Sequence, residues 1–181
     1  DRSILIDSQG RVLDGDTILA GVAPHLENKT RTVVATVMSN LALENLVSSL
    51  GMTFLRTPVG DRYVAKEMRT HGHILGGEKS GHMLFGPEHG FRGDGLYTFL
   101  KVAECLWKQG ARGSSFDTTF KNFAADYQDL PQELRNFPAT RRDALENLPN
   151  LEEEVKRVED WLGEKGRTVV RFSGTELKLR L

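Results

Sequence analysis

The sequence predicts an α/β protein, in which a mixed, mainly parallel α/β domain is followed by a smaller α+β domain. Three short apolar runs alternate with two segments of helical periodicity, an order typical of a parallel sheet covered by helices. A small, polar stretch then precedes a second group of one helix and two strands. The segments are 32–38, 39–50, 53–56, 63–70 and 73–75, then the connection 110–115, then 150–162, 168–170 and 176–181.

Local signals support the elements near the start of the chain. Ile4 to Asp7 and Arg11 to Leu13 flank the turn residues Ser8-Gln9-Gly10, which predicts a hairpin. Asp14 or Asp16 can cap a short helix after it. The next run, Thr32 to Met38, is apolar at most positions, as expected for a strand buried on both faces.

The helices that follow also have recognisable ends. Ser39 or Asn40 can cap a helix that ends at Gly51, and its apolar residues share one face. A further helix is expected from about Leu96 to Gln109. In the second part, Asn150 is a plausible N-cap with Glu153 in the capping-box position. Residues 171–175 then form a loop between two strands.

Composition excludes several classes of protein. With 24 basic and 25 acidic side chains among 181 residues, the formal charge is −1, so the sequence lacks the basic surface of a general nucleic-acid binder. No apolar run approaches the roughly 20 residues that span a bilayer, so no membrane partner is expected. The single Cys105 cannot form an internal disulfide, which favours the cytoplasm.

The loop Arg171-Phe172-Ser173-Gly174-Thr175 contains the groups that bind a phosphate ester. A guanidinium offers a planar fork of donors, and two hydroxyls add neutral donors beside exposed backbone N–H groups. Glycine at 174 allows a tight turn in which those N–H groups converge. A strand-connecting turn explains the same residues, and composition alone favours that simpler interpretation.

The loop from Gly76 to His82 contains a carboxylate, an ammonium, a hydroxyl and an imidazole. Glu78 and Ser80 could hold two neighbouring hydroxyls of a sugar, because a carboxylate accepts from both and a serine donates or accepts. A solvated polar hairpin is the simpler alternative. His82 is either a proton carrier or hydroxyl ligand, or a hydrogen-bonded structural histidine at the start of the next strand.

A third polar cluster, Gly60-Asp61-Arg62, follows a predicted strand and precedes a predicted helix. Asp61 is expected to cap that helix, and Arg62 to project near its electropositive N-terminus, where a sugar or phosphate could lie. A plain capped turn explains Asp61 fully and Arg62 in part.

Taken in order, Gly-Asp-Arg-Tyr at 60–63, Gly-Glu-Lys-Ser-Gly-His at 77–82 and Arg-Phe-Ser-Gly-Thr-Glu at 171–176 resemble the α-D-phosphohexomutase family. The resemblance covers nearly the whole chain. It implies a four-domain protein, with 1–27 similar to the end of the second domain, 28–112 to the third and 113–181 to a truncated fourth. The missing N-terminal domains would then be partners of this chain.

The resemblance also implies roles for individual residues. The sugar hydroxyls would be held by Glu78 and Ser80, and the unreacting phosphate by Arg171, Ser173, Gly174 and Thr175. Further candidates for substrate binding are Gly60, Asp61, Arg62 and His82, and Arg180 could also reach the phosphate. Arg180 is as well explained as an exposed strand arginine. Leu177 stands where the family usually has proline, which could loosen the entry to the last strand.

Asp1-Arg2 resembles the tail of the family's metal loop, so Asp1 would be a ligand of Mg²⁺ and Arg2 a possible catalytic neighbour of the phosphoryl group. The first two aspartates of that loop are missing, and one carboxylate suits Mg²⁺ poorly. Asp14-Gly15-Asp16 is interpreted as a turn and cap instead. A zinc site from His71, His73 and His82 is not supported by the spacing.

Within the family, residues 59–64 are more similar to phosphoglucosamine mutases than to the phosphomannomutase/phosphoglucomutase group. The implied reaction interconverts glucosamine 6-phosphate and glucosamine 1-phosphate through a phosphoserine, which this chain lacks. The alternatives are a phosphomannomutase/phosphoglucomutase, or a sugar-phosphate-binding fragment with no activity. Because Cys105 is expected in the core and no nucleophile replaces the serine, the chain alone is predicted to be inactive.

Overall fold

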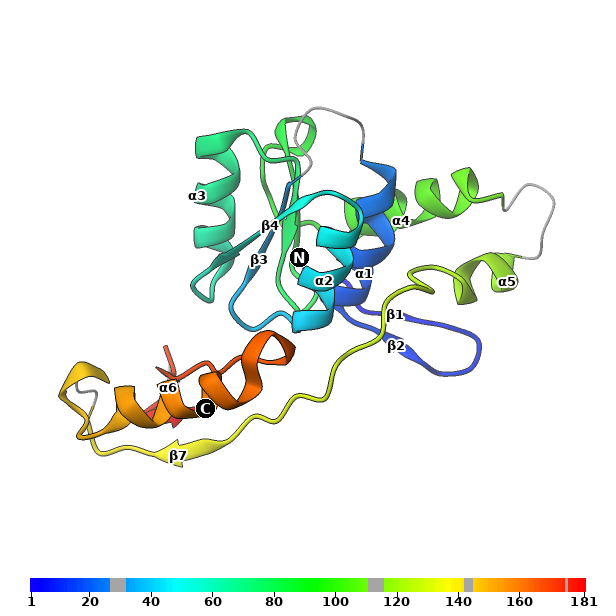
Figure 1. Cartoon of the computed structure of the whole chain (residues 1–181). Helices are drawn as coiled ribbons and strands as arrows, with labels where there is room; N and C mark the ends of the chain where they lie inside the picture. Colours follow the sequence, from blue (N-terminus) through cyan, green and yellow to red (C-terminus); the bar gives the residue numbers. More distant parts are fainter. Residues whose placement is uncertain (27–31, 111–115, 142–144, 175) are drawn as a thin grey trace. The chain divides into compact units, whose positions relative to one another are not determined.

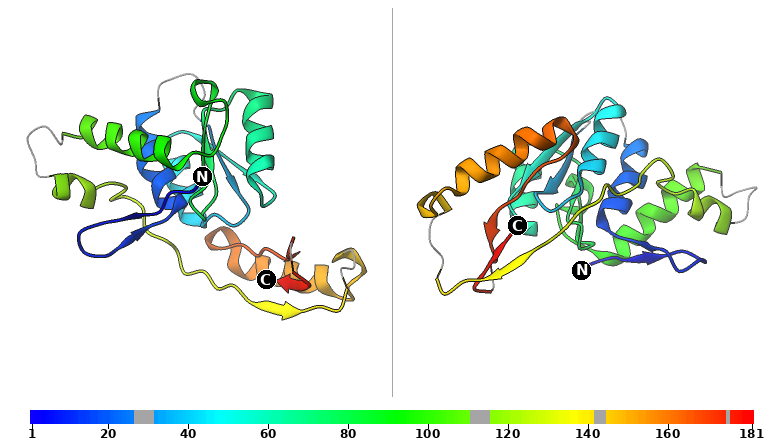
Figure 2. Two further views of the ribbon diagram at one scale, coloured as in Figure 1. Left: turned by 180° about the vertical axis from the view of Figure 1, so that it is seen from behind. Right: turned by 60° about the horizontal axis from the view of Figure 1, so that its bottom comes forward.

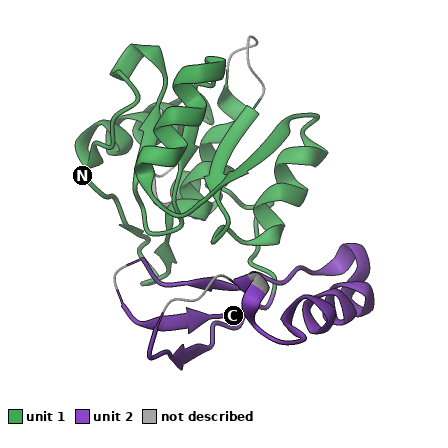
Figure 3. Ribbon diagram, turned by 90° about the vertical axis from the view of Figure 1, so that its left-hand side faces the viewer, with its two compact units in different colours: residues 1–130 green, residues 131–181 purple. Residues whose placement is uncertain are grey.

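The computed structural model describes residues 1–26, 32–110, 116–141, 145–174 and 176–181. The chain forms two compact units, Asp1–Leu130 and Pro131–Leu181 (Figure 3). No helix of the described residues is long and apolar enough to cross a membrane.

The first unit is built on a four-stranded sheet in the order β4-β3-β5-β6. Its strands are β3 (Thr32–Thr36), β4 (Thr53–Thr57), β5 (Leu75–Gly77) and β6 (Met83–Phe85). The central strand β3 runs parallel to both β4 and β5, and only β6 is antiparallel to its neighbour β5. This confirms the predicted mixed, mainly parallel sheet. Every residue of β3 is buried, as its apolar sequence predicted.

Helices cover both faces of this sheet (Figure 1). On one face pack α1 (Gly15–Val22), α2 (Leu41–Ser49) and α4 (Gly95–Lys108), and on the other α3 (Asp61–His71). Successive strand residues point to opposite faces. Val33 therefore joins the larger core beneath α1, α2 and α4, whereas Val34 packs against Val64 and Met68 of α3.

The N-terminal segment folds into this unit. Strands β1 (Leu5–Ile6) and β2 (Val12–Leu13) pair antiparallel and confirm the predicted hairpin (Figure 2). Asp14 caps α1 by accepting a hydrogen bond from the backbone N–H of Thr17 at 3.0 Å, which confirms one of the two expected caps. The apolar side of α1 is fully buried.

The region after α4 also belongs to the first unit. Helix α5 (Phe116–Lys121) is followed by Phe123, which is 1% exposed and lies against Gly21, where a side chain would overlap its ring. Residues 116–130 therefore cluster with the first unit, although 113–181 was expected to form the second domain. The expected domain boundaries at 27/28 and 112/113, and 111–115 of the expected connection, lie outside the described residues.

The second unit contains an antiparallel sheet in the order β7-β9-β8, beside one long helix. Its elements are β7 (Asn136–Pro138), α6 (Leu151–Leu162), β8 (Arg171–Phe172) and β9 (Lys178–Arg180). The predicted α+β class is confirmed. The strand expected at 168–170 was placed too early, because it begins at Arg171, and β7 was not predicted.

Two predicted helix caps are wrong. Asp61 is the first residue of α3, and the N-cap is Gly60 at φ 129°, with no side-chain cap. The Asp61 carboxylate accepts instead from the N–H of its neighbour Arg62 at 2.8 Å. Asn150 does precede α6, but its φ of 59° is left-handed and its side chain makes no capping hydrogen bond, so the capping box with Glu153 does not form.

Short 3₁₀ turns complete the described elements. They are Ala23–His25, Pro87–His89, Leu145–Asn147 and Gly163–Lys165.

Candidate functional site

The loop between β5 and β6 is a tight turn fixed by backbone hydrogen bonds. Glu78 donates its N–H to the carbonyl of His82 at 3.0 Å, and Gly81 donates to the carbonyl of Glu78 at 2.9 Å. Gly81 has a φ of +90°, which favours glycine. The sequence places a glycine at the position where this turn requires one.

The same loop is held from outside by the N-terminal segment. Ser3 donates its N–H to the carbonyl of Gly81 at 2.8 Å, and Gly15 donates to the carbonyl of Lys79 at 3.0 Å. A side chain at Gly15 would overlap the carbonyl oxygen of Glu78. Sequence reasoning took Gly15 for an ordinary turn residue and missed this close approach, because it depends on a segment more than sixty positions away.

Glu78 is the centre of a polar cluster. Its carboxylate is buried, and Oε1 accepts a hydrogen bond from the backbone N–H of Gly60 at 3.0 Å. Its Oε2 lies 3.9 Å from Nδ1 of His82, and the opposite ring nitrogen of His82 lies 3.9 Å from Asp61 and 4.0 Å from Asp1. The fold thus brings together five residues that the sequence marked in three separate segments.

The His82 ring is buried against a glycine. A side chain at Gly93 would overlap Nε2 of His82, so the ring position depends on that residue. Gly93 forms an isolated antiparallel bridge with Leu84, which aligns it beside the loop. Gly93 was missed because no local motif marks it.

Three other predicted residues of this cluster are exposed. The Arg62 guanidinium donates to the Tyr63 hydroxyl at 2.8 Å and lies 4.7 Å from the centre of that ring. Ser80, at the tip of the turn, and Arg2 both face solvent. Of the predicted sugar-binding residues, Arg62 and Ser80 are therefore exposed, whereas Glu78 and His82 are buried.

Lys79 points into a separate acidic cluster. Its Nζ lies 2.8 Å from Asp129, 3.6 Å from Asp14 and 3.7 Å from Asp16. Burial alone would lower the pKa of Lys79, but the hydrogen bond to Asp129 and the charges of Asp16 and Asp14 raise it above its ordinary value. Lys79 thereby fixes the loop between Glu78 and Ser80.

Asp16 is the buried member of this cluster. Its side chain has no exposed surface, and Oδ2 accepts a hydrogen bond from the backbone N–H of Asn40 at 2.8 Å. Burial raises the pKa of Asp16 to about 6, against the lowering effects of Asn40 and Lys79. The interpretation of Asp14-Gly15-Asp16 as a turn and cap holds for Asp14, but Asp16 also anchors the sequence-distant Asn40 and Lys79.

In the second unit, two predicted phosphate ligands lie side by side. Arg171 and Arg180 are register partners on β8 and β9. Burial and the neighbouring charge of Arg180 lower the pKa of Arg171 from its ordinary value. Glu176 accepts from Arg180 at 2.9 Å and partly offsets this pair of cations. Two adjacent guanidinium groups form a favourable place for an anion.

Ser173 directly follows β8 and is held by hydrogen bonds to two residues further along the chain. This residue is buried, donates its N–H to the carbonyl of Lys178 at 2.8 Å, and accepts from the N–H of Glu176 at 3.3 Å through its hydroxyl. Gly174 does not have a positive φ, so the predicted turn does not use a left-handed glycine. Nothing lies within 4 Å of the place where a side chain would start at Gly174. Thr175 lies outside the described residues.

Asp1 does not fit a magnesium site by itself. Its side chain is 68% exposed and supplies one carboxylate beside the His82 ring, whereas Mg²⁺ takes near-octahedral oxygen ligands. The histidines named in the rejected zinc site are not all together, because His82 lies with Glu78, whereas His71 and His73 lie with Glu67.

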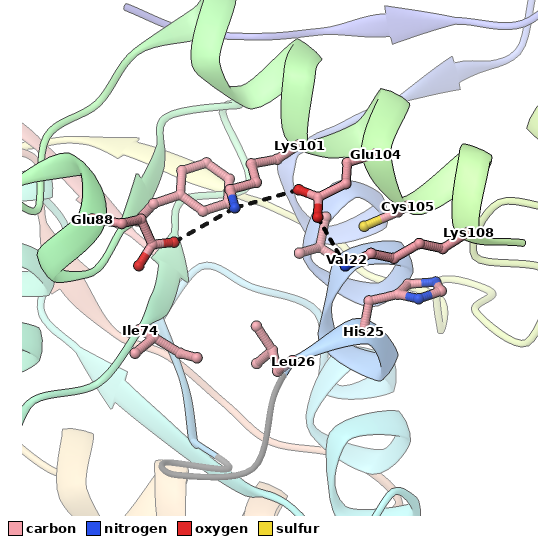
Figure 4. Close-up of a pocket in the computed structure, with 10 residues that line it drawn as sticks. Val22, His25, Leu26, Ile74, Glu88, Lys101, Glu104, Cys105 and Lys108 are labelled. Carbon is pink, nitrogen blue, oxygen red and sulfur yellow. Dashed lines mark hydrogen bonds and ion pairs between the residues drawn. The ribbon is translucent and has the colours of Figure 1, made fainter.

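A cavity of about 320 Å³ lies between α4 and the end of α1 (Figure 4). Its charged rim is internally paired, since Lys101 contacts Glu88 and Glu104, and Lys108 contacts Glu104 at 2.8 Å. Cys105 in its wall belongs to the core, as predicted, and burial raises the pKa of its thiol to about 11. This cavity contains none of the predicted site residues.

Both units match known domains of a single class of protein. Residues 14–126 match the family description "Phosphoglucomutase/phosphomannomutase, alpha/beta/alpha domain III", and residues 134–181 match "Phosphoglucomutase/phosphomannomutase, C-terminal domain". The α/β unit and the α+β unit follow each other in that order. The chain therefore belongs to the phosphoglucomutase/phosphomannomutase family of phosphohexomutases.

More particular similarities point to one branch of the family. A phosphoglucosamine mutase of Anaeromyxobacter sp. is 44% identical over the whole chain, and one of Corynebacterium urealyticum is 40% identical. The chain spans 38% and 40% of the lengths of these relatives, respectively. An N-acetylphosphoglucosamine mutase of Aspergillus fumigatus, solved with GlcNAc-6P and magnesium, shares the fold, with a TM-score of 0.76 at 21% identity over 98% of this chain and 44% of that one.

Proposed function

We propose that this chain is the sugar- and phosphate-binding part of a phosphoglucosamine mutase, which interconverts glucosamine 6-phosphate and glucosamine 1-phosphate. The observation that carries the proposal is the cluster of Glu78 and His82, on a loop fixed by backbone hydrogen bonds, with Gly60 at the start of α3. It is supported by relatives named phosphoglucosamine mutase that are 39–44% identical over the whole chain.

Glu78 is the proposed anchor for the sugar. Its Oε1 is occupied by the N–H of Gly60, so the carboxylate is oriented before any sugar arrives. Oε2 lies 3.9 Å from Nδ1 of His82, too far for a strong hydrogen bond, and can accept from a sugar hydroxyl. Ser80 at the exposed tip would meet a neighbouring hydroxyl. Preorganised groups of this kind lower the entropic cost of positioning the substrate.

Arg171, Ser173, Gly174 and Arg180 are the proposed holders of the phosphate that does not react, with Thr175 completing the loop. The adjacent guanidinium groups of Arg171 and Arg180 repel each other until an anion lies between them. The open space above Gly174 leaves room for the phosphate oxygens to approach the backbone. This clamp would serve the phosphate whether it is on the 6- or the 1-position.

The complete reaction needs groups that this chain does not supply. In the proposed mechanism a phosphoserine donates its phosphoryl group to the free hydroxyl of the sugar phosphate, and the resulting bisphosphate returns its other phosphoryl group to the serine. Mg²⁺, when bound, would offset charge on the transferring group. It would need carboxylates beyond Asp1, with Arg2 near the phosphoryl group. Alone, the 181 residues are proposed to bind without turnover.

We also propose that the intact protein works in the cytoplasm, which is consistent with a single, unpaired cysteine in the sequence. The second candidate function is a phosphomannomutase/phosphoglucomutase. It is favoured by a putative phosphomannomutase of Thermus thermophilus, which shares 25% identity and a TM-score of 0.57 over 68% of this chain.

The test is a comparison of kcat/KM on the full-length protein, with glucosamine, mannose and glucose phosphates as substrates. Glucosamine phosphate is expected to be turned over fastest. A faster reaction with mannose or glucose phosphate would reject the proposed substrate and favour the second candidate.

Two variants test the residues. Glu78→Gln and Arg171→Ala should each lower kcat/KM by about 10²-fold or more, as expected for loss of a charged, oriented substrate contact of about 3 kcal/mol. Glu88→Gln and Arg157→Ala are matched controls, because both side chains are exposed and neither is a proposed site residue. Equal activity of Glu78→Gln and Glu88→Gln would show that Glu78 is not part of the substrate-binding site.

A further inference from the structure

A carboxylate and two imidazoles meet at the C-terminal end of α3. Glu67 and His71 lie four residues apart on one face of the helix, and Nδ1 of His71 is 2.8 Å from Oε1 of Glu67. The helix ends at Gly72, whose φ of +72° reverses the chain, and His73 then donates its N–H to the carbonyl of Met68 at 3.0 Å.

This reversal places His73 beside the helix it has just left. The rings of His71 and His73 are stacked, with centroids 5.6 Å apart and planes inclined by 24°. One ligand atom from each of Glu67, His71 and His73 lies within 4.8 Å of the other two.

His73 supplies a second, independent observation. Its Nδ1 is buried and has no hydrogen-bond partner among the described residues, although buried ring nitrogens usually have one. His73 therefore has an unpartnered ring nitrogen with a lone pair that a ligand could use.

We propose that Glu67, His71 and His73 form a binding site for a divalent transition-metal ion of the zinc type, with water completing the coordination. Two imidazoles and one carboxylate are a ligand set that Zn²⁺ accepts, leaving one position open. Mg²⁺ is not the expected occupant, because it prefers oxygen ligands. The partial negative charge at the end of a helix also favours a cation here.

The required adjustment is small. Ligand atoms around a tetrahedral zinc ion lie about 3.4 Å apart, as follows from zinc–ligand distances of about 2.0–2.1 Å. The ligand atoms lie within 4.8 Å of one another, so the most distant pair would approach by at most about 1.4 Å, while Oε1 of Glu67 and Nδ1 of His71, now 2.8 Å apart, would separate slightly. The side chain of His71 is 54% exposed and that of Glu67 is 33% exposed, so both can rotate without disturbing the core.

The site lies away from the proposed sugar loop. Helix α3 has 11 residues, and its first residue, Asp61, belongs to the Glu78 cluster. At a rise of about 1.5 Å per residue the two ends of the helix are about 16 Å apart. A bound ion would tie the end of α3 to the segment that leads into β5, and so stabilise the first unit without contacting the substrate. The inference does not depend on the proposed function.

The test is calorimetric titration of ZnCl₂ into the EDTA-treated, dialysed 181-residue chain. One ion should bind per chain, and His71→Gln should weaken binding by at least about tenfold, because even loss of an outer-shell partner of a metal site costs about 10–100-fold. His71 is exposed, so this variant should fold normally. His25→Gln, which changes a histidine outside the cluster, is the matched control and should bind as the unmodified chain does.

Co²⁺ provides a readout that a structural effect of the substitution cannot imitate. The unmodified chain should give the visible absorption of protein-bound, four-coordinate Co²⁺, and Zn²⁺ should displace it. Glu67→Gln should lose this absorption while keeping the circular dichroism of the folded chain. No heat with Zn²⁺, or equal Zn²⁺ affinity of His71→Gln and the unmodified chain, would overturn the proposal.

Discussion

The two compact units differ in what they bury. All the apolar side chains that are buried among the described residues belong to the first unit, and they form cores on both faces of its sheet. In the described part of the second unit only Ser173 is buried. Several of its large apolar residues are exposed, Trp161 by 82%, and others, such as Leu162 and Phe172, are only half-buried. In a unit of this size the hydrophobic core rarely contributes more than a few kcal/mol to the free energy of unfolding.

The difference in buried apolar residues explains how each proposed binding loop is positioned. The Glu78 loop is fixed by a packed core beneath it and by backbone hydrogen bonds from Ser3 and Gly15. The Arg171 loop depends on a three-stranded ladder and on surface charges such as Glu176. The proposed sugar-binding loop is therefore held by contacts with a packed core, whereas the proposed phosphate-binding loop is held by a small sheet and surface ion pairs.

The largest expected effect contrasts two aromatic residues. Phe123→Ala should destabilise the first unit by about 3–5 kcal/mol, because a large, fully packed ring leaves a cavity. Trp161→Ala should change stability by less than about 0.5 kcal/mol, because most of that side chain is already in water. Urea unfolding followed by circular dichroism measures both. Similar losses in the two variants would mean that the second unit has a core of its own.

The next effect concerns the charge buried in the first unit. Because the pKa of Asp16 is raised from 3.8 to about 6, the folded chain holds this proton over a pH range in which the unfolded chain has released it. Stability should therefore fall as pH rises from about 4 to about 6, and the penalty should remain above that. A shift of about 2 units corresponds to at most about 3 kcal/mol.

Asp16→Asn should remove most of that pH dependence and raise the free energy of unfolding at pH 7. The amide oxygen can still accept from Asn40, and Lys79 keeps its contact with Asp129. Thermal unfolding from pH 4 to pH 7 measures the slope, with the exposed Asp126→Asn as control. The same slope in Asp16→Asn and the unmodified chain would show that Asp16 does not titrate in this range.

A smaller effect compares the glycines of the two loops. Gly15→Ala should cost about 1–3 kcal/mol, because its methyl group would overlap the backbone of Glu78 and displace the loop. Gly174→Ala meets nothing within 4 Å and should leave stability nearly unchanged, while weakening phosphate binding in the full-length protein. Thermal unfolding and titration with glucosamine 6-phosphate separate these outcomes. An unchanged stability of Gly15→Ala would show that the loop containing Glu78 can shift to accommodate the methyl group.

Much of the fold could be predicted because its signals are local. The apolar run at Thr32 to Thr36 marked a strand buried on both faces, and Asp14 marked the start of α1. The proposed loops were also marked, since glycines and charged groups gather in them. By contrast, β7 has only three residues, all exposed, and no alternation that distinguishes it from a loop.

The rest could not be predicted because it depends on contacts between distant segments. Lys79 meets Asp129 across fifty positions, and Gly93 makes room for a ring eleven positions earlier. The helix cap at Asp61 failed for a related reason, since Gly60 is held by Glu78 from another loop. His71 and His73 were considered with His82. Glu67 lies one helical turn before His71, but only the reversal at Gly72 brings His73 beside both of them.

The smallest effect concerns the start of α6. Asn150 occupies the left-handed region at φ 59° without a capping hydrogen bond, and glycine adopts this region more easily than asparagine. Asn150→Gly should therefore stabilise the second unit by a few tenths of a kcal/mol. If the asparagine instead capped the helix in solution, the same change would cost a few tenths. Hydrogen exchange at the Val155 amide measures the sign, with Glu164→Gln as a control outside α6. Faster exchange in Asn150→Gly would show that the Asn150 side chain caps α6 in solution. A local polar contact would then stabilise this helix, although the surface around it is exposed.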